Sequence, residues 1–183
     1  MFNKSRMQTL KTGLLFIGIL LLQASFKPAA PQAKTRWVTL DEAQAMNKNQ
    51  RRPILIDLYT DWCGWCKVMD RKTYGDGRVA EYLEKNFYAV KFNAEGRRDA
   101  RLGSRVFRFN PQYNTHDLAI YLSHGQLSYP STVILPTDGS DPQVIPGYLQ
   151  PADFEKILKY FGEGHFGKIS FTQFEKDFKG QWK

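Results

Sequence analysis

The sequence contains only two cysteines, Cys63 and Cys66, among 183 residues. A secreted domain that depends on disulfides for its stability has more of them, spread along the chain. No cysteine is left for a structural crosslink, so the pair is either reactive or half of a metal site. Zinc takes four ligands, and the three histidines, His116, His124 and His165, are not spaced as a pair near the cysteines. We therefore expect no metal.

The sequence also lacks an apolar run long enough for a membrane-spanning helix, which needs about 20 residues. Residues 13–22 form a ten-residue apolar core that follows three basic residues and no acid. A basic start, a short apolar core and a small residue at Ala24 are typical of an export signal. We predict a signal peptide over residues 1–25, cleaved on export to the periplasm or cell envelope. An uncleaved membrane anchor is the alternative.

Basic runs with interleaved aromatic residues, which are typical of nucleic-acid-binding proteins, are nearly absent although the net charge is +8. One cluster stands out, and its members are Arg97, Arg98, Arg101, Arg105 and Arg108. We expect a solvated basic face there and no nucleic-acid partner; a docking surface for an acidic partner is the alternative.

The hydrophobic content of 42% is enough for a folded core.

What the sequence does have is a stretch, residues 53–67, that joins an apolar run to the two cysteines. Ile54 to Tyr59 is interrupted only by Asp57 and predicts a strand covered on both faces. Cys63-Gly64-Trp65-Cys66 follows, and then a helix-like segment from about Lys67 to Arg71. The N-terminus of a helix stabilises a thiolate. The i, i+3 spacing places both sulfurs on one face, close enough to bond.

The strand, Asp57, Trp62, the Cys63-to-Cys66 motif and the Lys67 that follows it together resemble the thioredoxin superfamily. The resemblance covers about residues 37–163. It implies an α/β thioredoxin-like fold, in which helices flank a central mixed sheet. It also implies a thiol–disulfide oxidoreductase with no cofactor beyond a redox-active disulfide between Cys63 and Cys66.

The resemblance assigns roles to four catalytic residues. Cys63, exposed at the turn, is the attacking thiolate, and Cys66 is the resolving thiol buried behind it. Asp57, buried beneath the pair, exchanges a proton with Cys66, because burial raises the pKa of a carboxyl toward neutrality. Lys91 lies where the family often has a lysine beside this carboxylate; a solvated lysine is the alternative.

The resemblance also implies a substrate groove. Pro130 is the counterpart of the family's cis-proline, which faces the cysteines. It turns the backbone of Tyr129 outward, where a substrate strand can pair with it. Trp62, Gly64 and Trp65 line the groove from the other side, although plain hydrophobic cover accounts for part of Trp65.

The remaining segments complete the predicted organisation. Residues 26–36 read as a linker, and residues 164–183 as a C-terminal extension with a short helix. Residues 95–126 exceed what a compact thioredoxin needs. We predict that they form a helical insert before the cis-proline strand. A capping box at Thr39 predicts the start of the first helix.

The function that follows is the reduction, or exchange, of protein disulfides in the cell envelope. Gly-Trp between the cysteines lacks the histidine of oxidising and isomerising members of the family, which favours a reductant. A reductant in the envelope needs an electron donor at the membrane, and we expect the protein to act as a monomer. The alternatives are a thioredoxin-fold binding or chaperone module, and an oxidase or isomerase that uses the same dithiol.

Overall fold

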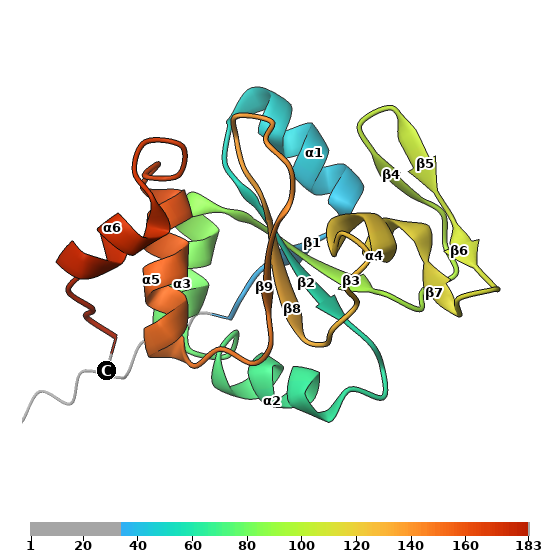
Figure 1. The fold of residues 1–183 in the computed structure, drawn as a ribbon, viewed down its shortest axis with the longest axis horizontal. Coiled ribbons are helices and arrows are strands. Elements are labelled where there is room, and N and C mark those ends of the chain that lie inside the picture. The colour runs from blue at the N-terminus through green and yellow to red at the C-terminus, as the bar shows by residue number, and fades with distance from the viewer. Residues whose placement is uncertain (1–33, 183) are drawn as a thin grey trace, which may run out of the picture. The chain divides into compact units, whose positions relative to one another are not determined.

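The computed structural model describes residues 34–182, so the predicted signal peptide and most of the predicted linker lie outside the described residues. The centre is a five-stranded sheet with the order β1-β3-β2-β8-β9 (Figure 1). Its strands are β1 (Trp37–Val38), β3 (Tyr88–Asn93), β2 (Ile54–Tyr59), β8 (Ser131–Leu135) and β9 (Gln143–Pro146). Strands β1, β3 and β2 are parallel to one another. Strand β8 pairs antiparallel with β2, and β9 pairs antiparallel with β8. The predicted mixed sheet is confirmed.

Helices cover both faces of this sheet (Figure 1). One face carries α1 (Leu40–Asn49) and α4 (Asp117–Leu122). The other carries α2 (Gly64–Lys72), α3 (Gly77–Asn86) and α5 (Pro151–Gly162). In the described residues, no helix combines the length and the apolar character that crossing a membrane requires.

The central strand β2 contributes to both cores. Ile56 and Leu58 pack in the core beneath α1 and α4, whereas Leu55 packs with α2, α3 and α5. Side chains along a strand alternate between faces, so Asp57 shares the face of Leu55. The sequence therefore directs this carboxyl toward the layer that contains α2.

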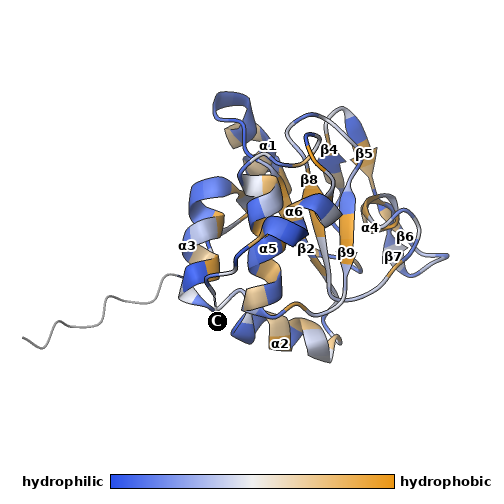
Figure 2. Cartoon of the chain, turned by 60° about the vertical axis from the view of Figure 1, so that its left-hand side comes forward, coloured by the Kyte–Doolittle hydropathy of each residue, from blue (hydrophilic) through white to orange (hydrophobic). Residues whose placement is uncertain are grey.

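The distribution of hydropathy agrees with these layers. Figure 2 shows hydrophobic residues along β8 and α4, whereas α3 and α5 have both hydrophobic and hydrophilic residues. In α5 the residues that face the sheet include Phe154 and Leu158, both fully buried. Their i, i+4 spacing is that of one helix face.

Two helix starts follow from local capping. Thr39 and Glu42 form the predicted capping box, in which the Thr39 hydroxyl accepts from the Glu42 N–H at 3.2 Å. Helix α2 begins at Gly64, three residues before the predicted start, because Cys63 acts as its N-cap. The first cysteine thus lies directly at the end of a helix.

The prediction of a helical insert over residues 95–126 is wrong for most of that segment. Two hairpins occupy it: β4 (Ala100–Leu102) with β5 (Arg105–Phe107), and β6 (Phe109–Asn110) with β7 (Thr115–His116). Gly103, with φ of 60°, forms the two-residue loop of the first hairpin with Ser104, as such turns require. Only α4 is helical, and its fully buried Leu118, Ala119 and Leu122 face the core.

The C-terminal residues pack against α5. Helix α6 (Phe171–Asp177) begins at the N-cap Ser170, and Phe174 is buried against the Tyr160 ring. The fully buried Glu155 accepts hydrogen bonds through Oε2 from the backbone N–H groups of Gln181 and Trp182, both at 2.8 Å. A carboxylate inside the helix layer therefore anchors the last described residues.

Candidate active site

Cys63 and Cys66 form a disulfide at the N-terminus of α2, with their Cα atoms 5.3 Å apart. The backbone N–H of Cys66 donates to Cys63 Sγ at 3.0 Å. The expectation that Cys63 is the exposed partner is wrong for this oxidised state, because both residues are only 4% exposed. The two sulfurs are bonded to each other, so each shields part of the other from solvent. The helix end and its N–H group nevertheless act on Cys63, as the spacing predicted.

Asp57 is buried on the α2 side of the sheet, with 2% of its surface exposed. Lys91 lies opposite it in the β2–β3 register, and its Nζ is 3.3 Å from Asp57 Oδ2. Burial raises the pKa of Asp57 to about 6, and the charge of Lys91 opposes part of that rise. The structure thus brings Asp57 and Lys91 together, as the sequence analysis predicted.

Asp70, in α2, is a third member of this group that sequence reasoning missed. Its carboxylate contacts the ammonium of Lys91 directly. The same ammonium lies over the rings of Trp37 and Tyr59, at 5.3 and 4.9 Å from their centroids. Asp70 comes four residues after Cys66, on the same face of α2. That spacing was the available signal.

A cleft reaches this charged group from outside. It has a volume of about 450 Å³, and its lining includes Lys91, Asp70, Trp37 and Tyr74. The side chains of Asp57, Lys91 and Asp70 are 3%, 24% and 39% exposed. Exposure therefore rises stepwise from the buried carboxyl of Asp57 to the partly exposed carboxylate of Asp70.

The peptide bond between Tyr129 and Pro130 is cis, as predicted. Within residues 34–182, neither the backbone N–H nor the C=O of Tyr129 pairs with another backbone group. The next carbonyl, that of Pro130, accepts from the N–H of Gly147 at 2.8 Å. Tyr129 thus presents free backbone groups just before β8 begins.

Two exposed indoles flank the cysteines. Trp62 is 66% exposed, and its ring meets that of Tyr129 edge-on with centroids 6.0 Å apart. Trp65 is 62% exposed and lies 5.5 Å from the ring of Tyr148. Gly64 between them is exposed, and a side chain added there would meet open space. The structure places the predicted groove residues Trp62 and Tyr129 in contact; the partner of Trp65, Tyr148, was not predicted.

Glu95 was also missed. Its Oε1 accepts a hydrogen bond from Trp62 Nε1 at 2.9 Å. Next to it, Asn93 donates to the carboxylate of Asp61 at 2.9 Å. The loop before the cysteines is therefore tied at two points to the end of β3, and the orientation of Trp62 depends on that strand end.

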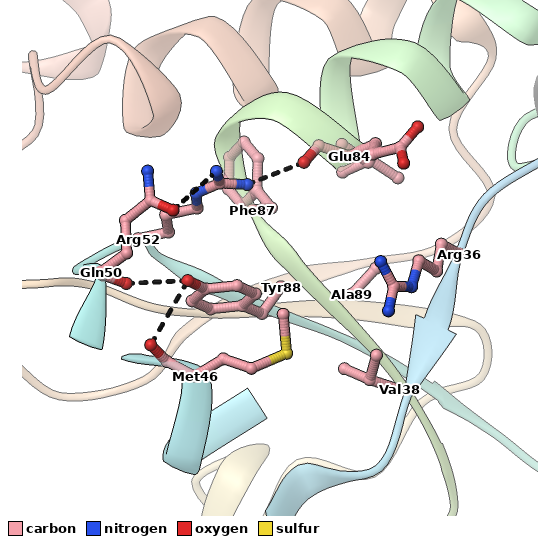
Figure 3. A pocket seen from close by; sticks show the side chains of 10 residues that line it. Arg36, Val38, Met46, Gln50, Arg52, Glu84, Phe87, Tyr88 and Ala89 are labelled. Atoms are coloured by element: carbon pink, nitrogen blue, oxygen red, sulfur yellow. Dashed lines mark hydrogen bonds between the residues drawn. The ribbon is translucent and has the colours of Figure 1, made fainter. Parts of the chain in front are cut away.

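A different pocket lies at the opposite end of the sheet, where β2 and β3 begin (Figure 3). Its volume is about 230 Å³. Arg52 crosses it and donates to the backbone oxygen of Glu84 at 2.7 Å and to Gln50 Oε1 at 3.0 Å (Figure 3). Neither cysteine lines this pocket. In the part of the chain that the structure describes, no group of three or more His, Cys, Asp or Glu side chains is arranged for a metal ion.

Known proteins that are similar to this chain in sequence or structure have the same type of fold. A family model described as "Thioredoxin-like domain" matches residues 40–162. The chain is 36% identical over 73 residues to the thiol:disulfide interchange protein DsbD of Ralstonia nicotianae. The aligned segment covers 39% of this chain and 12% of that protein. The DsbD of a Pseudomonas species is 45% identical over 56 residues, covering 31% and 8%. The chain thus spans about a tenth of the length of these curated relatives.

Among solved structures, one named "DsbH Oxidoreductase" superposes with a TM-score of 0.52 at 18% identity, covering 78% of this chain and 93% of that one. A thioredoxin from Thermus thermophilus gives 0.51 at 20% identity, covering 75% and 99%. At these identities the likeness concerns the fold alone. Since the family match extends over most of the described residues, the chain belongs to the thioredoxin-like domain family, and its Cys63–Cys66 disulfide gives it the reactive centre of a thiol–disulfide oxidoreductase.

Proposed function

We propose that this protein reduces disulfides of exported proteins, with Cys63 as the attacking thiolate and Cys66 as the resolving thiol. The observation that carries the proposal is the place of Cys63 at the N-cap of α2, where its sulfur accepts the N–H of Cys66. A helix N-terminus and a backbone N–H that donates to sulfur both stabilise a thiolate, which is the nucleophilic form of cysteine. The reduced protein then presents a thiolate for attack.

The proposed reaction moves two electrons from the dithiol to the substrate. The Cys63 thiolate attacks one sulfur of a substrate disulfide, and the other sulfur leaves as a thiolate that takes a proton from water. A mixed disulfide joins Cys63 to the substrate. Cys66, after losing its proton, attacks Cys63 Sγ, and the second substrate sulfur is released. The protein is left with the Cys63–Cys66 disulfide and requires no other cofactor.

Asp57 is proposed to accept the proton of Cys66. Its pKa of about 6 is close to neutrality, so the carboxylate is ionised yet basic enough to take a proton. Burial raises that pKa, the charge of Lys91 opposes part of the rise, and Asp70 positions Lys91. The cleft beside Lys91 supports a route by which the proton reaches solvent.

Substrate binding is proposed at the groove between the two exposed indoles. The free backbone groups of Tyr129 support pairing with an extended substrate segment. Trp62 and Trp65 offer apolar surface on either side of the reactive cysteine. Gly64 leaves room for the approach of the substrate sulfur, and Pro130 forms the floor of the groove.

The reducing direction and the compartment are part of the proposal. The Gly-Trp pair between the cysteines includes no histidine that would stabilise the thiolate further and make the disulfide oxidising. The basic and apolar leader and the likeness to thiol:disulfide interchange proteins support a place in the cell envelope. We propose that a membrane partner of that compartment supplies electrons, and that the protein acts as a monomer.

Single cysteine variants test the chemistry. Cys66→Ser, reduced and mixed with a disulfide substrate, is expected to accumulate a mixed disulfide that mass spectrometry detects, whereas Cys63→Ser forms none. Adduct formation by both variants alike would remove the assigned roles. Substrate binding that survives in Cys63→Ser, with no turnover by the native protein, would indicate the binding or chaperone module instead.

Equilibration with glutathione or dithiothreitol buffers tests the direction. We expect a reduction potential more negative than about −200 mV, in the range of reducing family members. A value near about −120 mV, typical of a strong oxidant, would overturn the reducing role and leave an oxidase that uses the same dithiol.

A further inference from the structure

The two hairpins that the sequence did not predict carry a concentration of positive charge. Residues 96–116 contain five arginines and a single acidic residue, Asp99. All five arginines are exposed. We call them the arginine face: Arg97, Arg98, Arg101, Arg105 and Arg108. In a chain of 183 residues with a net charge of +8, this short segment is the strongest local charge.

Three of these arginines are held by other side chains. Arg108 pairs with Asp99, with Nε 3.2 Å from Oδ2. Arg97 lies 4.5 Å from the ring centroid of Phe109, and Arg105 lies 4.7 Å from that of Phe107. Stacking fixes the planes of the guanidinium groups and leaves their edges free to donate.

The side chains of the other two, Arg98 and Arg101, have no partner among the described residues. Within residues 34–182 neither side chain makes a hydrogen bond, an ion pair or a ring contact; their backbone oxygens alone have partners, His116 Nε2 and Gln44 Nε2. An exposed guanidinium group without a partner does not stabilise the fold through its charge. Their charges remain available to a molecule that approaches from solvent.

The arginine face begins beside the substrate groove. Glu95, which holds the Trp62 indole, precedes Arg98 by three residues, a span of about 10 Å at most. At the other end of the insert, Thr115 interacts with the hydroxyl of Tyr129. The insert thus contacts both groove residues, so its charge acts on a substrate that is already in the groove.

We propose that the arginine face selects disulfide substrates that carry acidic residues a few positions from the reacting cysteine. This inference rests on the proposed function and names its substrate class. Asp61 and Glu95 lie next to Trp62 and repel an acid placed directly beside the cysteine. An extended peptide advances about 3.3 Å per residue. The favoured acids therefore stand about three to five positions away.

A protein substrate fits this position better than a lipid surface. A flat membrane laid on the arginine face would also cover the groove that begins three residues away. A peptide segment can enter the groove and extend over the hairpins at once. Charges at the rim of such a site act mainly on the rate of association and on its salt dependence.

The test uses the reduced full chain in single turnover, followed by tryptophan fluorescence. Three cyclic disulfide peptides of equal length carry two aspartates, two serines or two lysines, four positions from one cysteine. At low salt the native protein should react about 10-fold faster with the aspartate peptide than with the lysine peptide. The difference should nearly vanish at about 0.5 M salt, where charges are screened within a few ångströms.

Charge reversal identifies the residues. The variant R98E/R101E should lose the preference for aspartate, with a rate about 10-fold lower for that peptide and within about 2-fold for the serine peptide. The control K85E/K176E changes the net charge equally in the last turns of α3 and α6, helices that pack against α5. It should keep the preference.

Each outcome is decisive. No reaction with the serine peptide would overturn the proposed function itself, because that peptide tests the chemistry without charge. Reaction with serine but equal rates for the two charged peptides would overturn only the selection. The selection also fails if the two double variants lose it equally. Binding of the native chain, but not R98E/R101E, to vesicles with anionic lipid, without any peptide preference, would assign the face to a membrane.

Discussion

Replacement of Asp57 by asparagine should make the protein more stable and less active. The carboxyl is buried, and its pKa rises from 3.8 to about 6 on folding. Between these values the folded chain holds a proton that the unfolded chain has released, so stability falls as the pH rises. A shift of about 2 units corresponds to about 3 kcal/mol. This loss is complete above about pH 7 and absent below about pH 3.

Asparagine has a similar shape and does not ionise. The oxidised Asp57→Asn variant should therefore gain about 2.4 kcal/mol relative to the native protein when the comparison moves from pH 4 to pH 8. Urea unfolding at several pH values, with the disulfide intact, measures this difference. Asp141→Asn, at an exposed loop position, serves as the control and should show no such trend.

The same variant should react slowly. If Asp57 takes the proton of Cys66, its loss should slow release of the mixed disulfide by about 10²-fold or more at pH 7. A stability difference that is the same at pH 4 and pH 8 would refute the assignment of a burial-raised pKa. A variant that gains stability but keeps the native exchange rate would refute the proton-transfer role alone.

Three further results are expected. Lys91→Met removes a charge that lowers the pKa of Asp57, so the pH at which the exchange rate is half-maximal should rise; an unchanged pH–rate profile would contradict this. Glu155→Gln leaves the ammonium of Lys159, now 2.9 Å from Glu155 Oε1, without its buried partner, which should cost about 3 kcal/mol in urea unfolding; a change within error would show that the pair is not coupled. Thr39→Ala removes the cap of α1 and should cost about 1 kcal/mol, measured in the same way.

Local patterns accounted for most of the fold. The strand at Ile54–Tyr59 follows from an apolar run that only Asp57 interrupts, and the Thr39 cap follows from two residues three positions apart. The hairpins at residues 100–116 were not predictable in the same way. Their strands are two or three residues long, too short for the two-residue period to be distinguished from a helical one. The local signs of turns were Gly103 in the first hairpin and Asn110-Pro111 in the second.

The burial of Cys63 was misjudged for a different reason. A position at a helix start indicates where the sulfur lies but not what covers it. In the oxidised state only 4% of the residue is exposed. Burial of this kind depends on the packing of segments far apart in the sequence, which a local motif does not reveal.

Asp70 shows how far sequence reasoning reaches at this site. The pairing of Asp57 with Lys91 is a consequence of strand register, since neighbouring parallel strands align these two residues. The contact between Lys91 and Asp70 requires in addition that α2 packs across β3, which the core residue Met69 secures through burial in the α2–α3–α5 layer. A buried carboxyl with a pKa near 6 needs a path to water to be useful in proton transfer, and a single lysine would provide only a charge. The second carboxylate, that of Asp70, is partly exposed and lies at the solvent side of Lys91. In the proposed mechanism, helix packing therefore contributes a residue that the redox motif alone does not specify.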